Sequence, residues 1–428
     1  MINAFTFEAN KPWQQIPPEF ASLLFALQLG NPDTMRLKKL SDNEWTNLLA
    51  FCDVAHLTLQ IAQLPIEVFP LWVVERLKTN LADNALRFER VKATYREAAK
   101  ALDSAGVEHV VIKGFTQSPD YVADPRMRSQ SDIDIFCPAD SINAANRALQ
   151  AIGYSPFTAR VSYDRADHLP TLVRPGDWKW RGNLFDPEMP LSIELHFCLW
   201  NDRVSRICLP DAALFWERRT KREVDGLSFP CLSSVDHLAY LTLHILRNLI
   251  GADWIVHHVR ELAVFLDSHA EDETFWHNWY KAHSPLLRSF QSIAIYYAHA
   301  WFDCHLHPVA AAEIDKIPVS WQRWLHSFAG SALESMFHQN KDCLWLHLNF
   351  LSSHWDKWRI IRRALIPSSI GSIHSPALLS RNRRLVSADG RPLWMIYMAY
   401  LCSRTTTWVR GDLVTLSRGL RWRVLQRL

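Results

Sequence analysis

The sequence predicts an α+β fold in which a small mixed β-sheet is embedded in helical N- and C-terminal regions. Apolar residues recur at helical spacing along most of the chain, whereas a central stretch alternates polar and apolar residues, as half-buried strands do. Glycine is scarce, at 13 of 428 residues, and Leu, Ala and Arg are abundant, which favours helices. Together these observations place the strands in the middle of the chain.

The predicted helices lie on both sides of this centre. Before it, apolar spacing predicts helices over 20–29, 44–64 and 73–105, and Gly106 ends the last of them. After Ser233 the predicted helices are 235–250, 255–269, 275–282, 286–302, 320–329, 344–364, 393–402 and 408–425. Residues 367–389 are rich in Ser and Arg, and we expect them to form a linker or an exposed loop.

Three strands are predicted between the helical parts, over 109–112, 132–137 and 191–197. A tight turn at Gly114 follows the first strand and leads into a predicted helix, and a helix capped by Asp140 follows the second strand. The chain is therefore expected to have four parts. These are a helical region at 1–105, a core at 106–232, a second helical region at 233–366 and a basic helical tail at 367–428.

Composition excludes several classes of protein. The chain is 48% hydrophobic and 21% charged, as is usual for a globular protein in water. The eight cysteines form no CxxC pair, so a structural zinc site is not expected, and such scattered thiols suit the reducing cytoplasm. The N-terminus lacks the basic and apolar regions of a signal peptide, and the longest apolar stretch, at 393–401, is too short to cross a bilayer. We therefore expect a cytoplasmic protein without a transmembrane segment.

The net charge of +3 hides an asymmetry along the chain. Residues 356–428 contain 14 Lys and Arg against three acids, whereas the preceding residues contain 33 against 41. A basic end of this kind can meet nucleic acid, an anionic membrane or an acidic partner. The simpler interpretation is that these arginines solvate helix faces and lie over tryptophans.

The 132–137 strand carries a pair of carboxylates. Asp132 and Asp134 are two residues apart, so they share one face of the strand, while Ile133 and Ile135 point to the other. Neighbouring carboxylates repel each other and raise each other's pKa unless a cation lies between them. Oxygen ligands select hard ions, so the pair predicts a site for Mg²⁺ or Mn²⁺. An exposed strand face also carries acids without any metal, which is the structural alternative.

A second alternating strand supplies a third acid. Glu194 and His196 share one face of the 191–197 strand, and if the two strands are neighbours Glu194 completes a three-carboxylate cluster. Two-metal phosphoryl transfer uses such a cluster. Gly114 in the turn after the first strand would let backbone approach a phosphate. Arg126 and Arg128 lie before the aspartates, where arginines can bind phosphate oxygens. His196 alone is as well explained by packing or hydrogen bonding.

The order of these elements resembles a known family, the uncharacterised nucleotidyltransferases of bacteria, a branch of the DNA-polymerase-beta-like nucleotidyltransferase superfamily. The resemblance covers roughly residues 80–270. It rests on the segments Val111-Ile-Lys-Gly, Tyr121, Pro125-Arg126-x-Arg128-x-x-Ser131-Asp-Ile-Asp-Ile135, Gly153-Tyr154 and Ile193-Glu-Leu-His196. A weaker likeness extends to Asp236–His244 and Val259–Leu266.

The resemblance implies metal-dependent transfer of a nucleoside monophosphate from a triphosphate, usually ATP, to an acceptor, with release of pyrophosphate. It implies that the catalytic and metal-binding residues are Asp132, Asp134 and Glu194. It further implies that nucleotide is bound by Lys113, Gly114, Arg126, Arg128, Ser131 and His196. The ion would be Mg²⁺ or Mn²⁺, and we expect the acceptor to be a small molecule, peptide or protein rather than RNA.

Two positions depart from the superfamily pattern. Gly114 is followed by the bulky Phe115, where the wider superfamily has Gly-Ser or Gly-Gly, and Glu194 replaces the commoner aspartate. The bulky residue favours an alternative in which the fold binds nucleotide or a partner without turnover. The basic tail favours another, in which the core adds nucleotides to RNA.

A tryptophan-rich loop precedes the third predicted strand. Residues 178–187 contain Trp178, Lys179, Trp180 and Arg181, which could stack a base or bind an acceptor, or could simply pack on one another. His168 and Asp186 are further candidates for the site. The sequence contains no HExxH, GxSxG, GxGxxG or Walker A motif, which argues against zinc hydrolases, α/β-hydrolases and the common nucleotide-binding loops.

Overall fold

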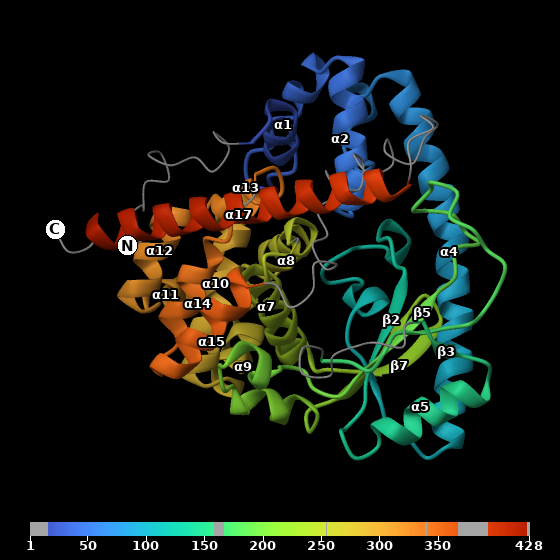
Figure 1. The fold of residues 1–428 in the computed structure, drawn as a ribbon. Helices are drawn as coiled ribbons and strands as arrows, with labels where there is room; N and C mark the ends of the chain where they lie inside the picture. Colours follow the sequence, from blue (N-terminus) through green and yellow to red (C-terminus); the bar gives the residue numbers. More distant parts are fainter. Residues whose placement is uncertain (1–15, 158–166, 254, 339, 367–392, 426–428) are drawn as a thin grey trace. The chain divides into compact units, whose positions relative to one another are not determined.

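The computed structural model describes residues 16–157, 167–253, 255–338, 340–366 and 393–425 (Figure 1). The predicted linker at 367–389 lies outside these residues. The chain divides into two compact units, each discontinuous in sequence. The sheet unit comprises Ser22–Ile245 and His257–Lys316, and the terminal unit comprises Met1–Ala21, Leu246–Val256 and Ile317–Leu428.

A single seven-stranded mixed sheet forms the centre of the sheet unit, in the order β3-β4-β5-β2-β1-β7-β6. The strands are β1 (Val110–Val111), β2 (Asp132–Phe136), β3 (Ser155–Pro156), β4 (Leu172–Val173), β5 (Ser192–His196), β6 (Thr220–Val224) and β7 (Leu227–Cys231). The pairs β2·β5 and β1·β7 are parallel, and the remaining pairs are antiparallel. The predicted α+β fold with helical flanks is therefore confirmed.

Helices precede and follow the sheet along the chain. Those before it are α1 (Pro18–Ala26), η2 (Thr34–Lys39), α2 (Asp42–Val54), α3 (Thr58–Ile61), η3 (Ile66–Val68) and α4 (Leu71–Ser104). Within the sheet region lie η4 (Gly114–Gln117), η5 (Pro125–Met127), α5 (Ile142–Ala151), α6 (Asp202–Ser205) and η6 (Pro210–Phe215). After it come α7 (Ser234–Gly251), α8 (Val256–Ser268), α9 (Glu273–Ala282), α10 (Pro285–Phe302) and α11 (Pro308–Asp315).

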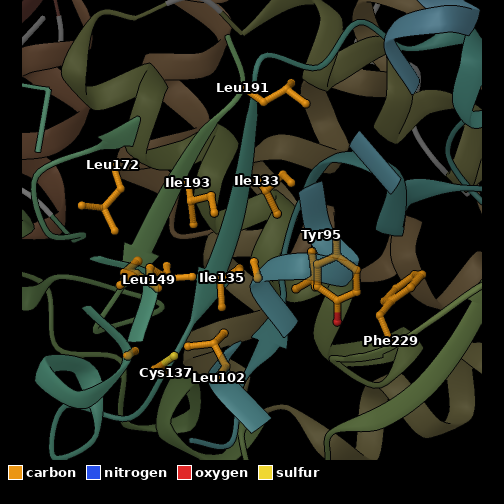
Figure 2. Packing of buried hydrophobic residues seen from close by; sticks show 14 of the residues in the cluster. Tyr95, Leu102, Ile133, Ile135, Cys137, Leu149, Leu172, Leu191, Ile193 and Phe229 are labelled. Atoms are coloured by element: carbon orange, nitrogen blue, oxygen red, sulfur yellow. The ribbon is translucent and has the colours of Figure 1, made fainter. Parts of the chain in front are cut away.

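Helices α4 and α5 cover one face of the sheet and form its core. Ile133, Ile135 and Ile193 are fully buried there, against Leu102 of α4 and Leu149 of α5 (Figure 2). Removing such side chains from water is the main stabilisation of the unit, at about 1.5–3 kcal/mol for each large aliphatic group. Because successive side chains of a strand point to opposite faces, the residues of β2 and β5 that alternate with these isoleucines point to the other face of the sheet.

Several local predictions about the sheet region were wrong. The segment after Gly114 forms the short 3₁₀ helix η4 rather than an α-helix. Helix α5 is preceded by Ser141 instead of Asp140 at its N-cap. The hairpin of β6 and β7 was not predicted, although Asp225 and Gly226 at its turn both have positive φ, as a two-residue hairpin turn requires.

The terminal unit contains α12 (Val319–Phe328), α13 (Ser331–Glu334), α14 (Cys343–Phe350), α15 (His354–Leu365) and α17 (Leu393–Leu425). The single helix predicted over 344–364 is two helices, because Leu351 is extended and the Ser353 hydroxyl caps α15 by accepting from the Asp356 amide. Conversely, the two helices predicted at 393–402 and 408–425 are one continuous helix. Among the described residues, no helix is long and apolar enough to cross a membrane.

Candidate metal and nucleotide site

Two neighbouring parallel strands bring the predicted acids together. In the β2·β5 pair, Asp134 lies directly opposite Glu194, and Asp132 lies opposite Ser192. The acids therefore occupy the face of the strands that α4 and α5 leave uncovered, together with His196. The predicted adjacency of the two strands is confirmed, and it joins residues that are far apart in the chain.

Asp134 is the centre of the arrangement. Its side chain is 3% exposed, and one oxygen, Oδ1, lies 2.7 Å from Lys113 Nζ and 2.8 Å from His196 Nε2. Lys113 is the last residue before Gly114, so the turn after β1 delivers a cation to a carboxylate on β2. A charged hydrogen bond of this length in a buried place is among the stronger polar contacts in proteins.

Glu194 is held by Thr171, which the sequence did not point to, and lies near two histidines that were sequence candidates. The Thr171 hydroxyl donates to its Oε1 at 2.9 Å, and its Oε2 lies 3.8 Å from His168 Nε2 and 3.9 Å from His196 Nε2. Thr171 immediately precedes the two-residue strand β4, which is too short to show a strand pattern in sequence. His168, a minor sequence candidate, thus lies beside the third acid.

The donor set fits a divalent cation. Among the described residues, ligand atoms of Asp134, Glu194 and His196 all lie within 4.8 Å of one another. The two carboxylates suit hard ions such as Mg²⁺ or Mn²⁺, whereas the imidazole is a ligand more typical of transition-metal ions. Asp132 is not a member of that group, although it stands on the same face. His196, which the sequence placed on the same strand face as Glu194, therefore belongs to the group of possible metal ligands.

The two aspartates differ in electrostatic state. Burial raises the pKa of Asp132 to about 7, and the neighbouring negative charge of Asp134 adds to this effect. Burial would also raise the pKa of Asp134, but Lys113 and His196 hold it below its usual range. Three carboxylates thus share essentially one lysine, and a bound cation would offset the excess negative charge.

His196 has a second carboxylate behind it. Its ring is 1% exposed, and Nδ1 lies 3.8 Å from Asp167 Oδ2, on the side away from Asp134. This separation is longer than a hydrogen bond, so Asp167 places a second negative charge behind the ring without a direct bond to it. Asp167 follows the undescribed residues 158–166, and no motif in the sequence marked it.

Gly114 is required by the packing of the turn. Its φ is +71°, and a Cβ at this position would lie 2.3 Å from Gln130 Nε2. Gln130 in turn donates to the Asp132 carbonyl at 2.6 Å and so fixes the start of β2. The side chain of Phe115 points into the core beside Tyr95 and Phe229, where its bulk is accommodated.

The two predicted phosphate-binding arginines are placed differently. Arg128 Nε donates to Glu261 Oε1 at 3.0 Å, and its charge is close enough to lower the pKa of Asp132. Arg126 instead pairs with Asp225 at 2.7 Å, at the turn of the β6–β7 hairpin, and with Asp124. The structure thus brings Arg128 toward the carboxylates and directs Arg126 to the hairpin.

Ser131 lies at the entrance to the strand that carries the aspartates. Its side chain is exposed, and its carbonyl accepts from the Ser192 amide at 3.2 Å, which extends the β2·β5 pairing by one residue. The exposed hydroxyl is one residue from Asp132, on the solvent side of the site.

The tryptophan-rich loop packs on itself. Trp178 Nε1 donates to Asp186 Oδ2 at 3.0 Å, and the two indoles of Trp178 and Trp180 meet edge to face with centroids 6.1 Å apart. Arg181 pairs with Glu188. Asp186 is therefore used to hold this loop and does not join the carboxylate cluster, whereas Trp180 keeps 44% of its surface exposed.

A histidine group borders the site beside Arg128. His257 and His258 begin α8, their ring centroids are 3.8 Å apart, and the His56 ring lies 5.1 Å from that of His257. Burial holds the pKa of His257 well below its usual range, so this imidazole is neutral at physiological pH. Glu261, one turn along α8, connects the group to Arg128.

One buried arginine braces the approach to both site strands. Arg87 of α4 is 2% exposed and donates to the carbonyls of Gln130, Asp186 and Met189 at 2.8, 3.1 and 2.9 Å. Gln130 precedes β2, and the other two carbonyls lie in the loop that leads to β5. A single guanidinium therefore fixes the starting points of the two strands that carry the acids.

Comparison with known proteins bears on this arrangement. No curated protein and no solved structure matches the chain. A family model described as an uncharacterised nucleotidyltransferase matches residues 41–303, which is well over half of the chain and includes every residue of the carboxylate cluster. The fold, the paired strands and this match agree, and the chain belongs to the family of uncharacterised nucleotidyltransferases.

Proposed function

We propose that this protein transfers a nucleoside monophosphate from a nucleoside triphosphate, ATP in the first instance, to an acceptor and releases pyrophosphate. The observation that carries the proposal is the parallel register that sets Asp134 opposite Glu194, with His196 in ligand distance of both. Membership of a nucleotidyltransferase family supports the reaction class. The acceptor is proposed to be a small molecule, peptide or protein.

The metal would be held by Asp134, Glu194 and His196, with Asp132 on the same face. When bound, a Mg²⁺ or Mn²⁺ ion supplies charge neutralisation on the triphosphate and lowers the pKa of the attacking group. Burial of Asp134 and His196 keeps their atoms fixed before the ion arrives, which limits the reorganisation that binding requires.

The remaining residues bind and orient the substrate. Lys113 stands beside Asp134 and can donate to a phosphate oxygen, and Arg128 brings a second cation to the same side. The acceptor's oxygen or nitrogen would attack the α-phosphorus while the bond to the bridging oxygen breaks and pyrophosphate leaves. The acceptor's proton would pass to Glu194 or a neighbouring carboxylate.

The test is a pyrophosphate-release assay with each of the four triphosphates and with Mg²⁺ or Mn²⁺. Wild type is compared with the double variant Asp132→Asn/Asp134→Asn and with Asp140→Asn, an exposed acid just beyond β2 that serves as the matched control. We expect release by wild type and control only. Intact mass of components of a cell extract would then show which species gains a nucleoside monophosphate.

Two outcomes would contradict the proposal. Full release by the double variant would show that these carboxylates are not catalytic. Tight ATP binding without release, in the presence of extract, would instead support a binding-only role, although the core position of Phe115 removes the sequence feature that favoured that role.

A further inference from the structure

The long C-terminal helix α17 has an inner face that is firmly packed within the terminal unit (Figure 1). A Cβ on Gly419 would lie 2.0 Å from Trp345, so the helix backbone contacts the indole of α14 directly. The Thr415 hydroxyl accepts from the Lys341 amide at 2.7 Å, and Arg418 donates to Asp342 at 2.8 Å. The rotation of α17 about its own axis is therefore fixed.

The opposite face of α17 carries an exposed aliphatic stripe. Val409, Leu413, Leu420 and Val424 are 42%, 62%, 61% and 60% exposed, and the half-buried Leu416 falls between them. Their spacing follows the period of a helix, so they form one continuous line on the side away from Gly419. Exposed leucines are individually ordinary, but an aligned row of them on a fixed helix is a contact surface.

Basic residues flank this stripe. Arg410, Arg421 and Arg423 are exposed on α17, and the only acid of the helix, Asp412, is already bound to Lys341 at 2.7 Å. Arg423 lies over the Trp345 ring, so the outer face combines the aliphatic side chains with the guanidinium groups of Arg410 and Arg421. This is the chemistry of a helix that lies in the plane of a membrane surface, with its apolar side chains in the acyl boundary and its arginines among anionic headgroups.

Helix α15 of the same unit repeats this chemistry. Trp355 and Trp358 are 58% and 48% exposed and stack at 5.0 Å, with Arg359 and Arg362 over their rings. The two helices are joined by Lys341, whose Nζ donates both to the Ala364 carbonyl and to Asp412, at 2.7 Å each. Exposed tryptophans beside arginines are typical of membrane-interface segments.

We propose that the outer face of α17 binds the surface of an anionic lipid bilayer. The choice of lipid over other occupants rests on charge and on the aliphatic row. The undescribed segment 367–392 contains Arg381, Arg383, Arg384 and Arg391 against the single acid Asp389, so it would be repelled from the stripe. A nucleic acid would pair with the arginines but would gain nothing from four aligned Leu and Val side chains.

The proposal is independent of the proposed function, because no residue of α15 or α17 belongs to the carboxylate cluster. It is tested by co-sedimentation of the full-length protein with vesicles of phosphatidylcholine alone or of phosphatidylcholine and phosphatidylglycerol in equal parts. We expect binding to the anionic vesicles only, and binding that weakens with added salt.

Three variants separate the contributions. Leu413→Gln/Leu420→Gln should weaken vesicle binding by about tenfold or more, since each leucine loses its burial in the acyl region. Arg410→Gln/Arg421→Gln should weaken it by about tenfold and flatten its salt dependence. Leu86→Gln, which changes a 60% exposed leucine of α4 in the sheet unit, is the matched control and should bind as wild type. All these positions are on the surface, and circular dichroism checks the fold.

Several results would overturn the proposal. Equal sedimentation with both vesicles, or none with either, would exclude an anionic bilayer. Full binding by the leucine variant, with salt-dependent binding of single-stranded RNA, would assign the basic face to nucleic acid. A concentration-dependent dimer that the leucine variant loses, without vesicle binding, would assign the stripe to a second copy of the chain. Vesicle binding by Asp132→Asn/Asp134→Asn keeps this test separate from that of catalysis.

Discussion

Two groups of neighbouring carboxylates among the described residues, one in each unit, are built in opposite ways. In the terminal unit, Asp342 and Glu334 share Arg418, which donates to Asp342 once and to Glu334 twice, at 2.8 and 3.0 Å. In the sheet unit, Asp134 and Glu194 stand side by side with Asp132, and Lys113 Nζ lies 2.7 Å from Asp134 Oδ1.

The two clusters differ in how far basic side chains of the protein neutralise their negative charge. Arg418 is a planar fork that satisfies oxygens of both of its carboxylates, and the Ser331 hydroxyl adds a bond of 2.6 Å to Asp342. Lys113 is a point charge that cannot satisfy three acids, and the pKa of Asp132 rises to about 7 as a result of burial and of Asp134. A cluster that its own chain compensates holds helices together, whereas one left with excess charge is suited to a cation from solution.

The largest expected difference between the clusters is in catalysis. Asp134→Asn should lower metal-dependent pyrophosphate release by about a thousandfold or more, because it removes a ligand at the centre of the site. Asp342→Asn should leave the rate within about twofold, since that carboxylate only packs helices. Steady-state rates of the two variants, at a temperature where both are folded, check the contrast. Comparable losses in both would break the distinction.

The clusters should also respond oppositely when the charge balance is changed. Arg418→Met leaves two acids unpaired and should lower the free energy of unfolding by about 2 kcal/mol, less than for a fully buried pair because the guanidinium is 31% exposed. Asp132→Asn removes repulsion and should not destabilise the metal-free protein. Thermal melting of both variants tests this. A lower melting temperature for Asp132→Asn would show that its charge is already compensated.

Metal ions should distinguish the clusters directly. A saturating excess of Mn²⁺, at about a hundredfold over its dissociation constant, should stabilise the wild type by about 2.7 kcal/mol. The shift should disappear in Asp134→Asn and in Glu194→Gln and persist in Asp342→Asn. Differential scanning calorimetry with and without the ion measures it. A shift retained by both site variants would place the metal elsewhere.

The smallest expected effect is on pH dependence. The folded-state pKa of Asp132 is raised to about 7, so the folded protein binds one proton more than the unfolded chain between about pH 4 and pH 7. Stability should therefore fall as pH rises through this window. A pKa difference of about three would correspond to about 4 kcal/mol, but solvent screening of the partly exposed Asp132 should reduce the fall to on the order of 1 kcal/mol, and Asp132→Asn should remove it. Asp134 has a lowered pKa, so its contribution is lost only below about pH 4, outside the window. Denaturation midpoints at several pH values check the sign, and an unchanged slope in the variant would contradict it.

The sequence could predict that the acidic side chains of each strand share one face. It could not predict which residue of β2 lies opposite which residue of β5. Alternation in 132–137 and 191–197 placed Asp132 with Asp134 and Glu194 with His196, because strand side chains have a period of two. Nothing local states which residue of one strand lies opposite which residue of the other. That choice is made by the buried isoleucines, which pair Ile133 with Ile193.

The ion-pair partner of Arg126 could not be predicted, because the partner is distant in the sequence. Arg126 pairs with Asp225, which is 99 residues away at the turn of a hairpin that was not predicted. Asp225-Gly226 is a strong hairpin signal in itself, but the flanking strands contain charged residues and Pro230. The continuity of α17 was missed because the run of three threonines at 405–407 disfavours a helix, yet the helix runs through it from Leu393 to Leu425.

The brace formed by Arg87 sets a limit on how far the protein can be shortened. The sheet begins at Val110, yet the guanidinium that fixes the starts of β2 and β5 comes from a helix that begins at Leu71. A fragment cut at the first strand would keep every side chain of the proposed metal site but would lose the hydrogen bonds from Arg87 that fix the strands carrying them. The smallest fragment that keeps the geometry of this site therefore includes α4. A design that moves the site to another protein would need a buried cation at the position of the Arg87 guanidinium.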